Sequence, residues 1–290
     1  MPGLKDIRKK MTGVRSTQQI TRAMKMMATV KLRRAMDSYL STHLYLEKLE
    51  QMVVDLRAVL PPNVSHPLFG GRAVKTTGIV LVTGERGLCG SFNHDLVKAC
   101  LRRLQDNPGQ EKKLILIGKK GVDHFRRLAF TVIGSHPDLV GKYSQKALGM
   151  AARNAISLYT TGVIDELVII YTHFVSTLER RIETRILLPV SEIGVGRKSR
   201  HHGDQRIQFD PSPEAILTAL IPRYVEGLFM KAVLESSASE QAARMVAMDA
   251  ATDRAQEIID ELTMKFNRTR QSVITKELSE VIAGADAQTH

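Results

Sequence analysis

The stretch Glu235–Ser272, ESSASEQAARMVAMDAATDRAQEIIDELTMKFNRTRQS, decides the fold that the sequence predicts. It contains no proline or glycine and is rich in Ala, Met, Glu and Gln, which have high helix propensity. Small side chains recur along it, at Ala238, Ala242, Ala243, Ala247, Ala250, Ala251 and Ala255. Alanines let a second helix approach to the lower end of the usual ~8–10 Å interaxial range. The stretch therefore predicts a long helix that packs against a helical partner.

The first 60 residues of the chain supply such a partner. One series of residues there advances in steps of three or four over about eight heptads, which indicates a coiled-coil seam. The series is Ile7, Met11, Val14, Gln18, Thr21, Met24, Ala28, Leu32, Ala35, Tyr39, Thr42, Leu46, Leu49, Val53, Leu56 and Leu60. Its three polar members reduce stability and are able to fix the register.

Prolines mark the ends of both predicted helices. The first helix should run from about Gly3 to Leu60, where Pro61-Pro62 ends it. The last should begin with Ser212 as a cap, bend at Pro222 and continue to about Ala283. We therefore expect an antiparallel two-helix coiled coil made of residues 1–60 and 210–290, with a linker at 61–75.

Residues 76–209 have the pattern of an inserted Rossmann-like α/β domain. Short β-branched runs alternate there with helical stretches, which is typical of a largely parallel sheet covered by helices. The expected strands are 78–83, 113–118, 166–172, a short one at 130–133 and an edge strand at 181–190. The expected helices are 95–104, 121–128 and 144–159.

Positive charge is concentrated at the start of the chain. Lys and Arg number 42 against 30 Asp and Glu, which gives a formal net charge of +12. An exposed basic collar is expected at Lys5, Arg8, Lys9, Lys10, Arg15 and Arg22. A basic coiled coil suits either a large acidic protein partner or a nucleic acid. Residues 1–34 contain no aromatic side chain for base stacking, which favours the protein partner.

Several other function classes find little support in the sequence. The chain shows neither a signal peptide nor an apolar run near the roughly 18 residues that span a membrane, so we expect a soluble cytosolic protein. Its two cysteines, Cys89 and Cys100, form neither a disulfide framework nor a metal site. His201 and His202 lie in a basic loop without accompanying ligands.

A glycine-rich segment, Gly84-Glu-Arg-Gly-Leu-Cys-Gly90, follows the first predicted strand. Glycines at strand ends bring backbone N–H groups close to phosphates, so a Rossmann-type oxidoreductase is an alternative function. The GxxGxxG spacing differs from the dinucleotide and P-loop fingerprints, and no acidic residue ends the second strand. We therefore expect no cofactor, metal or catalytic residue in this chain.

Four segments in order resemble the gamma subunit of the rotary (F-type) ATP synthase. They are ITRAMKMMA at 20–28 with KLRRA at 31–35, RGLCG at 86–90, ASEQAARMVAM at 238–248 and RQSVITKELSE at 270–280. The resemblance covers both helices and the insert. The family's usual Ser-Asp before RGLCG is Gly84-Glu85 here, which leaves the local shape of this loop open.

The resemblance implies a non-catalytic central rotor shaft. Its partners would be a ring of alpha and beta subunits, an epsilon subunit and a membrane-embedded c-subunit ring. The chain would bind no nucleic acid and would reach the cytoplasmic face of the bacterial plasma membrane only through the complex. Contacts with the alpha–beta ring are expected at Arg8, Lys9, Met24, Arg86, Cys89, Arg244, Arg270, Gln271, Val273, Ile274 and Leu278.

The end of the last helix is predicted to extend past the first. We expect the numbers of two residues that face each other in the antiparallel pair to add up to roughly 270. The last helix would then have no partner within the chain from about Asn267 onward. The segment that follows is apolar on a broad face, at Val273, Ile274, Leu278, Val281 and Ile282. An exposed apolar face of this kind normally marks an interaction surface.

Overall fold

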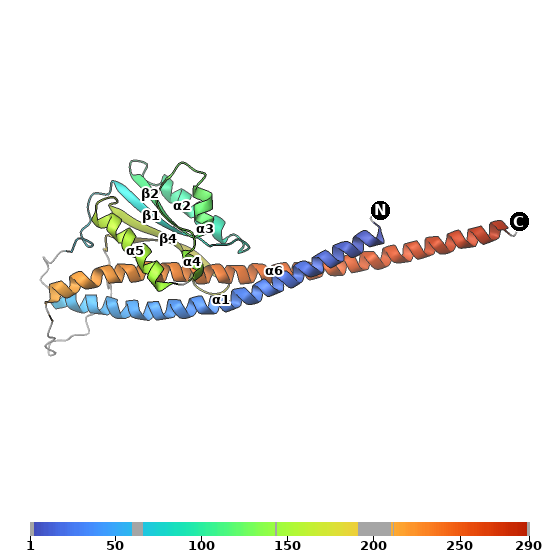
Figure 1. The fold of residues 1–290 in the computed structure, drawn as a ribbon, viewed down its shortest axis with the longest axis horizontal. Helices are drawn as coiled ribbons and strands as arrows, with labels where there is room; N and C mark the ends of the chain where they lie inside the picture. Colours follow the sequence, from blue (N-terminus) through green and yellow to red (C-terminus); the bar gives the residue numbers. More distant parts are fainter. Residues whose placement is uncertain (1–2, 60–65, 143, 191–209, 211, 289–290) are drawn as a thin grey trace. The chain divides into compact units, whose positions relative to one another are not determined.

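The computed structural model describes residues 3–59, 66–142, 144–190, 210 and 212–288 (Figure 1). The described residues belong to two compact units. The first unit joins the beginning of the chain, up to Ala28, to the end of the chain from Met245 onward. The second unit is Thr29–Arg244. The finer division at residues 60, 75 and 209 stays a prediction.

The two long helices have nearly the bounds that the proline positions predict. Helix α1 runs over Leu4–Val59, and helix α6 runs over Pro213–Gln288, a length of 76 residues. The hydroxyl of Ser212 accepts a hydrogen bond from the Ala215 amide at 3.2 Å, so the predicted cap is confirmed. Helix α6 continues through Pro222, and the predicted bend there stays a prediction.

The α/β part of the second unit contains one five-stranded sheet. Its strands are β1 (Thr76–Val82), β2 (Glu111–Ile117), β3 (Thr131–His136), β4 (Glu166–Phe174) and β5 (Arg180–Leu188). The strand order is β3-β2-β1-β4-β5, with parallel pairing except between β4 and β5. The largely parallel sheet and the edge position of the last strand are therefore confirmed.

The described residues of this unit also form four shorter helices. They are α2 (Phe92–Gln105), α3 (Lys119–Phe125), α4 (Leu139–Lys142) and α5 (Gln145–Thr160). Helices α2, α3 and α5 lie within a few residues of their predicted bounds. Helix α4 was not predicted, because a single turn is too short to produce a periodic pattern.

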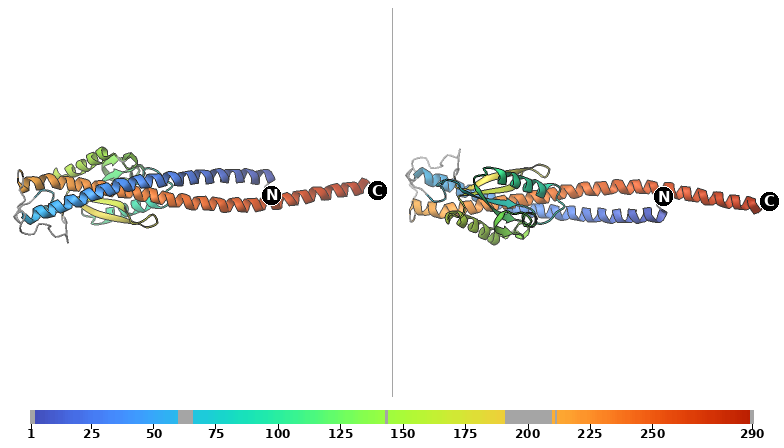
Figure 2. Two further views of the ribbon diagram at one scale, coloured as in Figure 1. Left: turned by 90° about the horizontal axis from the view of Figure 1, so that it is seen from below. Right: turned by 90° about the horizontal axis from the view of Figure 1, so that it is seen from above.

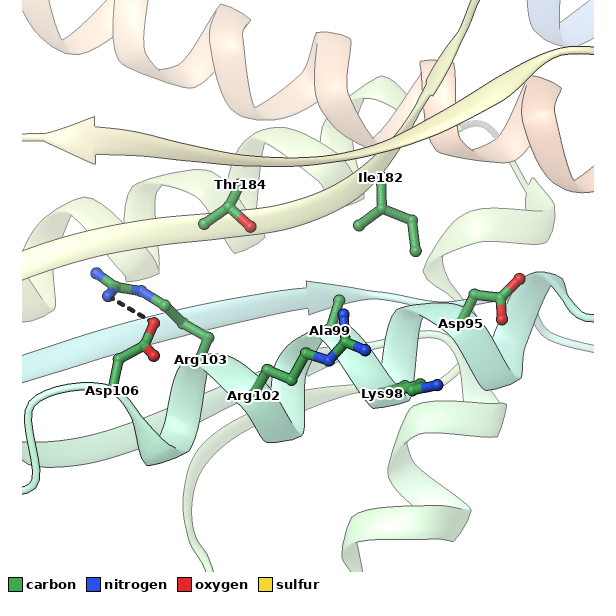
Figure 3. A pocket seen from close by; sticks show the side chains of 8 residues that line it. All are labelled: Asp95, Lys98, Ala99, Arg102, Arg103, Asp106, Ile182 and Thr184. Carbon is green, nitrogen blue, oxygen red and sulfur yellow. Dashed lines mark hydrogen bonds and ion pairs between the residues drawn. The ribbon is translucent and has the colours of Figure 1, made fainter.

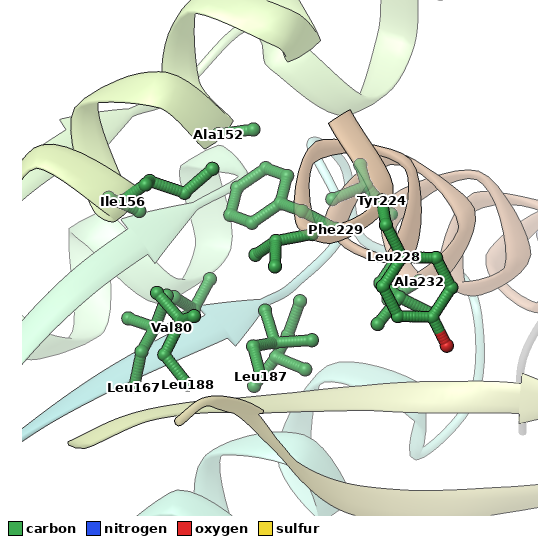
Figure 4. Packing of buried hydrophobic residues seen from close by; sticks show 14 of the residues in the cluster. Val80, Ala152, Ile156, Leu167, Leu187, Leu188, Tyr224, Leu228, Phe229 and Ala232 are labelled. Atoms are coloured by element: carbon green, nitrogen blue, oxygen red, sulfur yellow. The ribbon is translucent and has the colours of Figure 1, made fainter. Parts of the chain in front are cut away.

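Hydrophobic clusters cover both faces of the sheet, which explains why the inner strands are continuously apolar. On one face α5 and the first part of α6 pack over the sheet, with Phe229 1% exposed among Ala152, Ile156 and Leu187 (Figure 4). The same cluster contains the part of α1 from Leu46 to Leu56. On the other face α2 packs over the sheet.

In the first unit, the N-terminal part of α1 lies beside α6, and α6 continues beyond the start of α1 (Figure 2). The Gln18 amide donates to Gln256 Oε1 at 2.9 Å, and the hydroxyls of Thr21 and Thr252 are 2.8 Å apart. Lys25 forms an ion pair with Asp249. Two polar residues of the seam, Gln18 and Thr21, thus pair with polar side chains of α6.

These pairs correct the predicted register. Their position numbers add up to 273 or 274, where roughly 270 was expected. The ends of two antiparallel helices need not be level, and the difference is about one helical turn.

The register has a direct test. Cysteines that replace Thr21 and Thr252 should form a disulfide readily, because the two hydroxyls are within hydrogen-bond distance across the seam. The matched pair Thr21→Cys with Asp249→Cys fits the earlier register and should cross-link much more slowly. Gel mobility after mild oxidation measures both. Faster cross-linking of the control pair would contradict the observed register.

Candidate functional site

The glycine-rich segment forms a tight loop between β1 and α2, and Asn93 at the start of α2 holds it. The Asn93 side chain accepts a hydrogen bond from the Gly84 amide at 2.8 Å and donates to the Arg86 carbonyl at 3.3 Å. It also contacts Cys89 Sγ at 3.2 Å. Leu88 has a positive φ of 62° and points outward, with 62% of its surface exposed. The loop thus presents Leu88 to solvent and turns Cys89 inward.

Arg244 of α6 binds the backbone of this loop. Its Nη2 atom donates to the carbonyls of Arg86 and Gly87 at 3.4 and 3.3 Å. The same guanidinium forms a 2.5 Å ion pair with Glu240 and donates to the Gln241 side chain at 3.0 Å. Arg244 and Glu240 are both buried. The Arg244 guanidinium therefore donates hydrogen bonds to the loop carbonyls and also pairs with one buried carboxylate.

Burial and local contacts act in opposite directions on the pKa values of Glu240 and Glu85, the carboxylates beside this loop. Burial raises the pKa of Glu240, and the Arg244 guanidinium opposes that shift. Burial also raises the pKa of Glu85, whose oxygens accept hydrogen bonds from the amides of Lys119 and Val140. A cavity of about 370 Å³ lies here, lined by Lys31, Glu85, Arg86, Lys119, Asp138, Gly141, Glu240, Gln241 and Arg244. Its mixed charges provide neither a nucleophile–base pair nor a phosphate cradle.

The part of α6 just before Glu240 binds β4 through hydroxyl groups, which the sequence reading did not predict. Ser236 accepts a hydrogen bond from the Thr172 amide at 3.4 Å, and Ser239 donates to the Thr172 carbonyl at 3.2 Å. Glu235 lies 2.5 Å from His173 Nδ1. Serines at buried positions in an otherwise alanine-rich helix were the available signal, because buried hydroxyls need partners.

A second cavity, of about 640 Å³, lies between α2 and β5. Figure 3 shows Ile182 and Thr184 of the strand facing the α2 side chains. Arg103 contacts Asp106 at 3.4 Å and Glu166 at 3.4 Å, so its charge is already paired. This cavity also holds no arrangement of nucleophile and base. In the described part of the chain, no cluster of His, Cys, Asp and Glu could hold a metal, and His201-His202 lie outside it.

The remaining predicted contact residues lie on the helices of the first unit. Arg8 and Lys9 are exposed, and neither has a carboxylate within ion-pair distance among the described residues. Met24 is half-buried, and Arg270 and Gln271 are exposed on α6. Val273, Ile274 and Leu278 are also exposed, the last to 58%.

The structure thus brings together three of the predicted site residues, all in the second unit. Arg86, Cys89 and Arg244 meet at the loop after β1. Cys89 and Arg244 are buried within the chain, so little of their surface is available to a partner in the isolated protein. Contact of any predicted residue with another subunit stays a prediction. Within the described residues, no helix is both long and apolar enough to cross a membrane.

Comparison with known proteins covers nearly the whole chain. The family model for ATP synthase matches residues 3–288. The ATP synthase gamma chain of Heliobacterium modesticaldum is 39% identical over 294 residues, with 99% of each chain covered. That of Moorella thermoacetica is 41% identical over 293 residues, with the same coverage.

A solved structure has a similar fold. It is described as the central stalk and c-ring of the Tetrahymena thermophila mitochondrial ATP synthase. The matching chain is 25% identical with a TM-score of 0.58, and the alignment covers 80% of this chain and 99% of that chain. The chain belongs to the family of ATP synthase gamma chains.

Proposed function

We propose that the chain is the central rotor shaft of a proton-translocating ATP synthase. Rotation of the c-ring would turn it, and its unequal faces would drive the beta-subunit sites through binding, synthesis and release of ATP. The chain itself would supply no catalytic group. Its role would be mechanical. The long helices would provide length and stiffness, and their surfaces would attract each partner without binding one of them permanently.

The observation that carries this proposal is the exposed apolar end of α6. Val273, Ile274, Leu278, Val281 and Ile282 are between 37% and 69% exposed, beyond the start of α1. Burying a large apolar side chain contributes roughly 1.5–3 kcal/mol. Because apolar contacts are non-directional, a sleeve of other subunits could enclose this end and still let it turn.

The basic collar on α1 supports the same proposal. Arg8 and Lys9 belong to a set of exposed cations that also contains Lys5, Lys10, Arg15 and Arg22. Exposed ion pairs are individually worth only about 0–1 kcal/mol. Such cations would be drawn to acidic segments of each beta subunit in turn and released again. The expected partners are therefore the alpha and beta subunits, the epsilon subunit and the c-ring.

We place the assembled complex at the cytoplasmic face of the bacterial plasma membrane, and the chain would reach that membrane through its partners. A nucleic-acid-binding function is less well supported, because no aromatic side chain accompanies the basic collar. An oxidoreductase function is less well supported as well. Two carbonyls of the glycine-rich loop, those of Arg86 and Gly87, are bound to Arg244, and its first amide is bound to Asn93.

Direct observation of rotation tests the proposal. The chain would be co-expressed with the alpha and beta chains of its own organism, and the ring would be fixed to glass through the beta chains. Arg127, which is exposed after α3, would be replaced by Cys to carry a bead, since both native cysteines are buried. We expect one-directional rotation of the bead when ATP is added.

Two results would contradict the proposal. One is failure of the folded chain to enter a ring of alpha and beta chains. The other is ATP hydrolysis by a ring that contains the chain while the bead stays still. Beads on rings without ATP, and rings in which the chain carries no Arg127→Cys change, provide the matched controls.

A further inference from the structure

We propose that Glu240 and Arg244 act as a positioning pair that holds the loop Arg86–Cys89 in the shape needed to meet a partner. This inference rests on the proposed rotor function. Here the pair is called the loop clamp. Neither residue of the clamp needs to touch another subunit, because its work is done inside the chain. The clamp connects α6, through side chains, to the loop that follows β1.

The contacts of the clamp explain how it could control the loop. One guanidinium binds two successive carbonyls, those of Arg86 and Gly87, just before the residue with positive φ, Leu88. Fixing these carbonyls fixes the direction in which the side chains of Arg86 and Leu88 leave the backbone. Both side chains are exposed, so they form a surface suited to a partner with carboxylates beside an apolar side chain.

Close packing around Glu240 makes the clamp sensitive to single changes. A Cβ atom added at Gly84 would lie 2.7 Å from Glu240 Cδ and Oε1. Gly84→Ala should therefore displace the Glu240 carboxylate and weaken its ion pair with Arg244. Gly87→Ala is a matched control, because a Cβ there meets only the end of Lys120 at 4.0 Å.

Cys89 reports on the state of the loop. Its side chain is 1% exposed and lies next to Arg86 and Asn93, so a thiol reagent reaches it only when the loop opens. Cys100, on α2, is buried in the core beside the sheet and provides an internal control. Burial raises the pKa of Cys100 to about 12, which makes it still less reactive.

The experiment is maleimide labelling of the purified full-length chain, followed by mass spectrometry of the two cysteine peptides. We expect Arg244→Gln and Gly84→Ala to label at Cys89 ~10-fold faster or more than the unchanged chain, because labelling follows the population of the open loop. Arg244→Lys should fall between, since one ammonium cannot reproduce the fork of a guanidinium. Gly87→Ala should label at the original rate.

A change in the pKa of the Cys89 thiol cannot explain faster labelling in Arg244→Gln. Burial and the Glu240 carboxylate raise the pKa of Cys89, and the nearby Arg244 guanidinium partly opposes that shift. Removing that charge makes the thiolate rarer at neutral pH, so labelling of a loop that stayed closed would become slower. An increase in rate therefore reports opening.

Two labelling results would overturn the inference. One is an unchanged rate at Cys89 in both Arg244→Gln and Gly84→Ala. The other is equal acceleration at Cys100 in both variants, because the pair would then hold the whole domain rather than the loop. If Arg244→Gln alone exposes Cys100, that variant is unfolded and Gly84→Ala decides.

A second measurement connects the loop to rotor function. In vesicles that contain the assembled enzyme, Arg244→Gln should pump fewer protons for each ATP hydrolysed, with hydrolysis itself maintained, and Arg244→Lys should restore part of the loss. A purely structural role would lower both activities together. Faster labelling with unchanged coupling would overturn the link between this loop and a partner. Failure of the unchanged chain to rotate would instead contradict the proposed function.

Discussion

A chain that ends at Phe266 is expected to keep its coiled coil and to lose most of the coupling between ATP turnover and proton pumping. The deleted residues, 267–290, include the exposed apolar end of α6. The pairs between the two helices, Gln18–Gln256, Thr21–Thr252 and Lys25–Asp249, all lie before the cut, so the helices should still pair. Circular dichroism should show the helix retained, and vesicle assays should show reduced pumping.

Point variants distinguish the effect of the apolar face on assembly from the effect of helix length. Ile274→Asp with Leu278→Asp places two charges on the apolar face, where a water-poor sleeve would have to bury them. Each lost apolar contact is worth roughly 1.5 kcal/mol or more, so assembly should weaken ~100-fold or more. Lys276→Ala with Glu280→Ala is the matched control, because that ion pair is exposed and contributes little.

Three outcomes have distinct meanings. Weaker assembly or coupling with the aspartates, and none with the alanines, supports a bearing at this end of α6. Equal loss with both pairs would indicate that helix stability matters rather than the apolar face. Normal coupling in the chain that ends at Phe266 would show that this end is no bearing.

The second large effect is expected at Gly118, where β2 leads into α3. Its backbone has φ 88° and ψ 139°, a conformation that side chains disfavour. A Cβ atom there would lie 2.0 Å from the carbonyl oxygen of Thr83. That oxygen belongs to the backbone at the end of β1, so a side-chain rotation cannot relieve the clash. Gly118→Ala should therefore destabilise the second unit by ~4 kcal/mol or more.

Gly162 provides a matched control for this substitution. It also has a positive φ, of 77°, yet nothing lies within 4 Å of a Cβ atom added to it. Gly162→Ala should therefore cost only the backbone strain, ~1–3 kcal/mol. Urea unfolding, followed by circular dichroism and by the exposure of Cys100, compares the two variants. Similar midpoints for both would contradict the predicted clash with Thr83.

Apart from the single-turn helix α4, the sequence by itself determined the elements of the described residues and the family to which the chain belongs. The long helices, the alternating strands and helices, and the edge strand could be predicted because each depends on local periodicity and on punctuation by proline and glycine. Examples are α1, which ends just before Pro61-Pro62, and α6, which Ser212 caps. The family could be predicted because its motifs are short, specific and in order.

The tertiary structure decided which residues meet. The observed helix register differs from the predicted one by about one turn, because the sequence does not show whether the ends of the two paired helices are level. The tertiary structure also joined Arg244 to Arg86 and Gly87, more than 150 positions away, and Ser236 and Ser239 to β4. Arg244 on its own resembles a surface cation of a helix. Only packing of α6 against the sheet places it within hydrogen-bond distance of the Arg86 and Gly87 carbonyls, and burial there makes the contact specific.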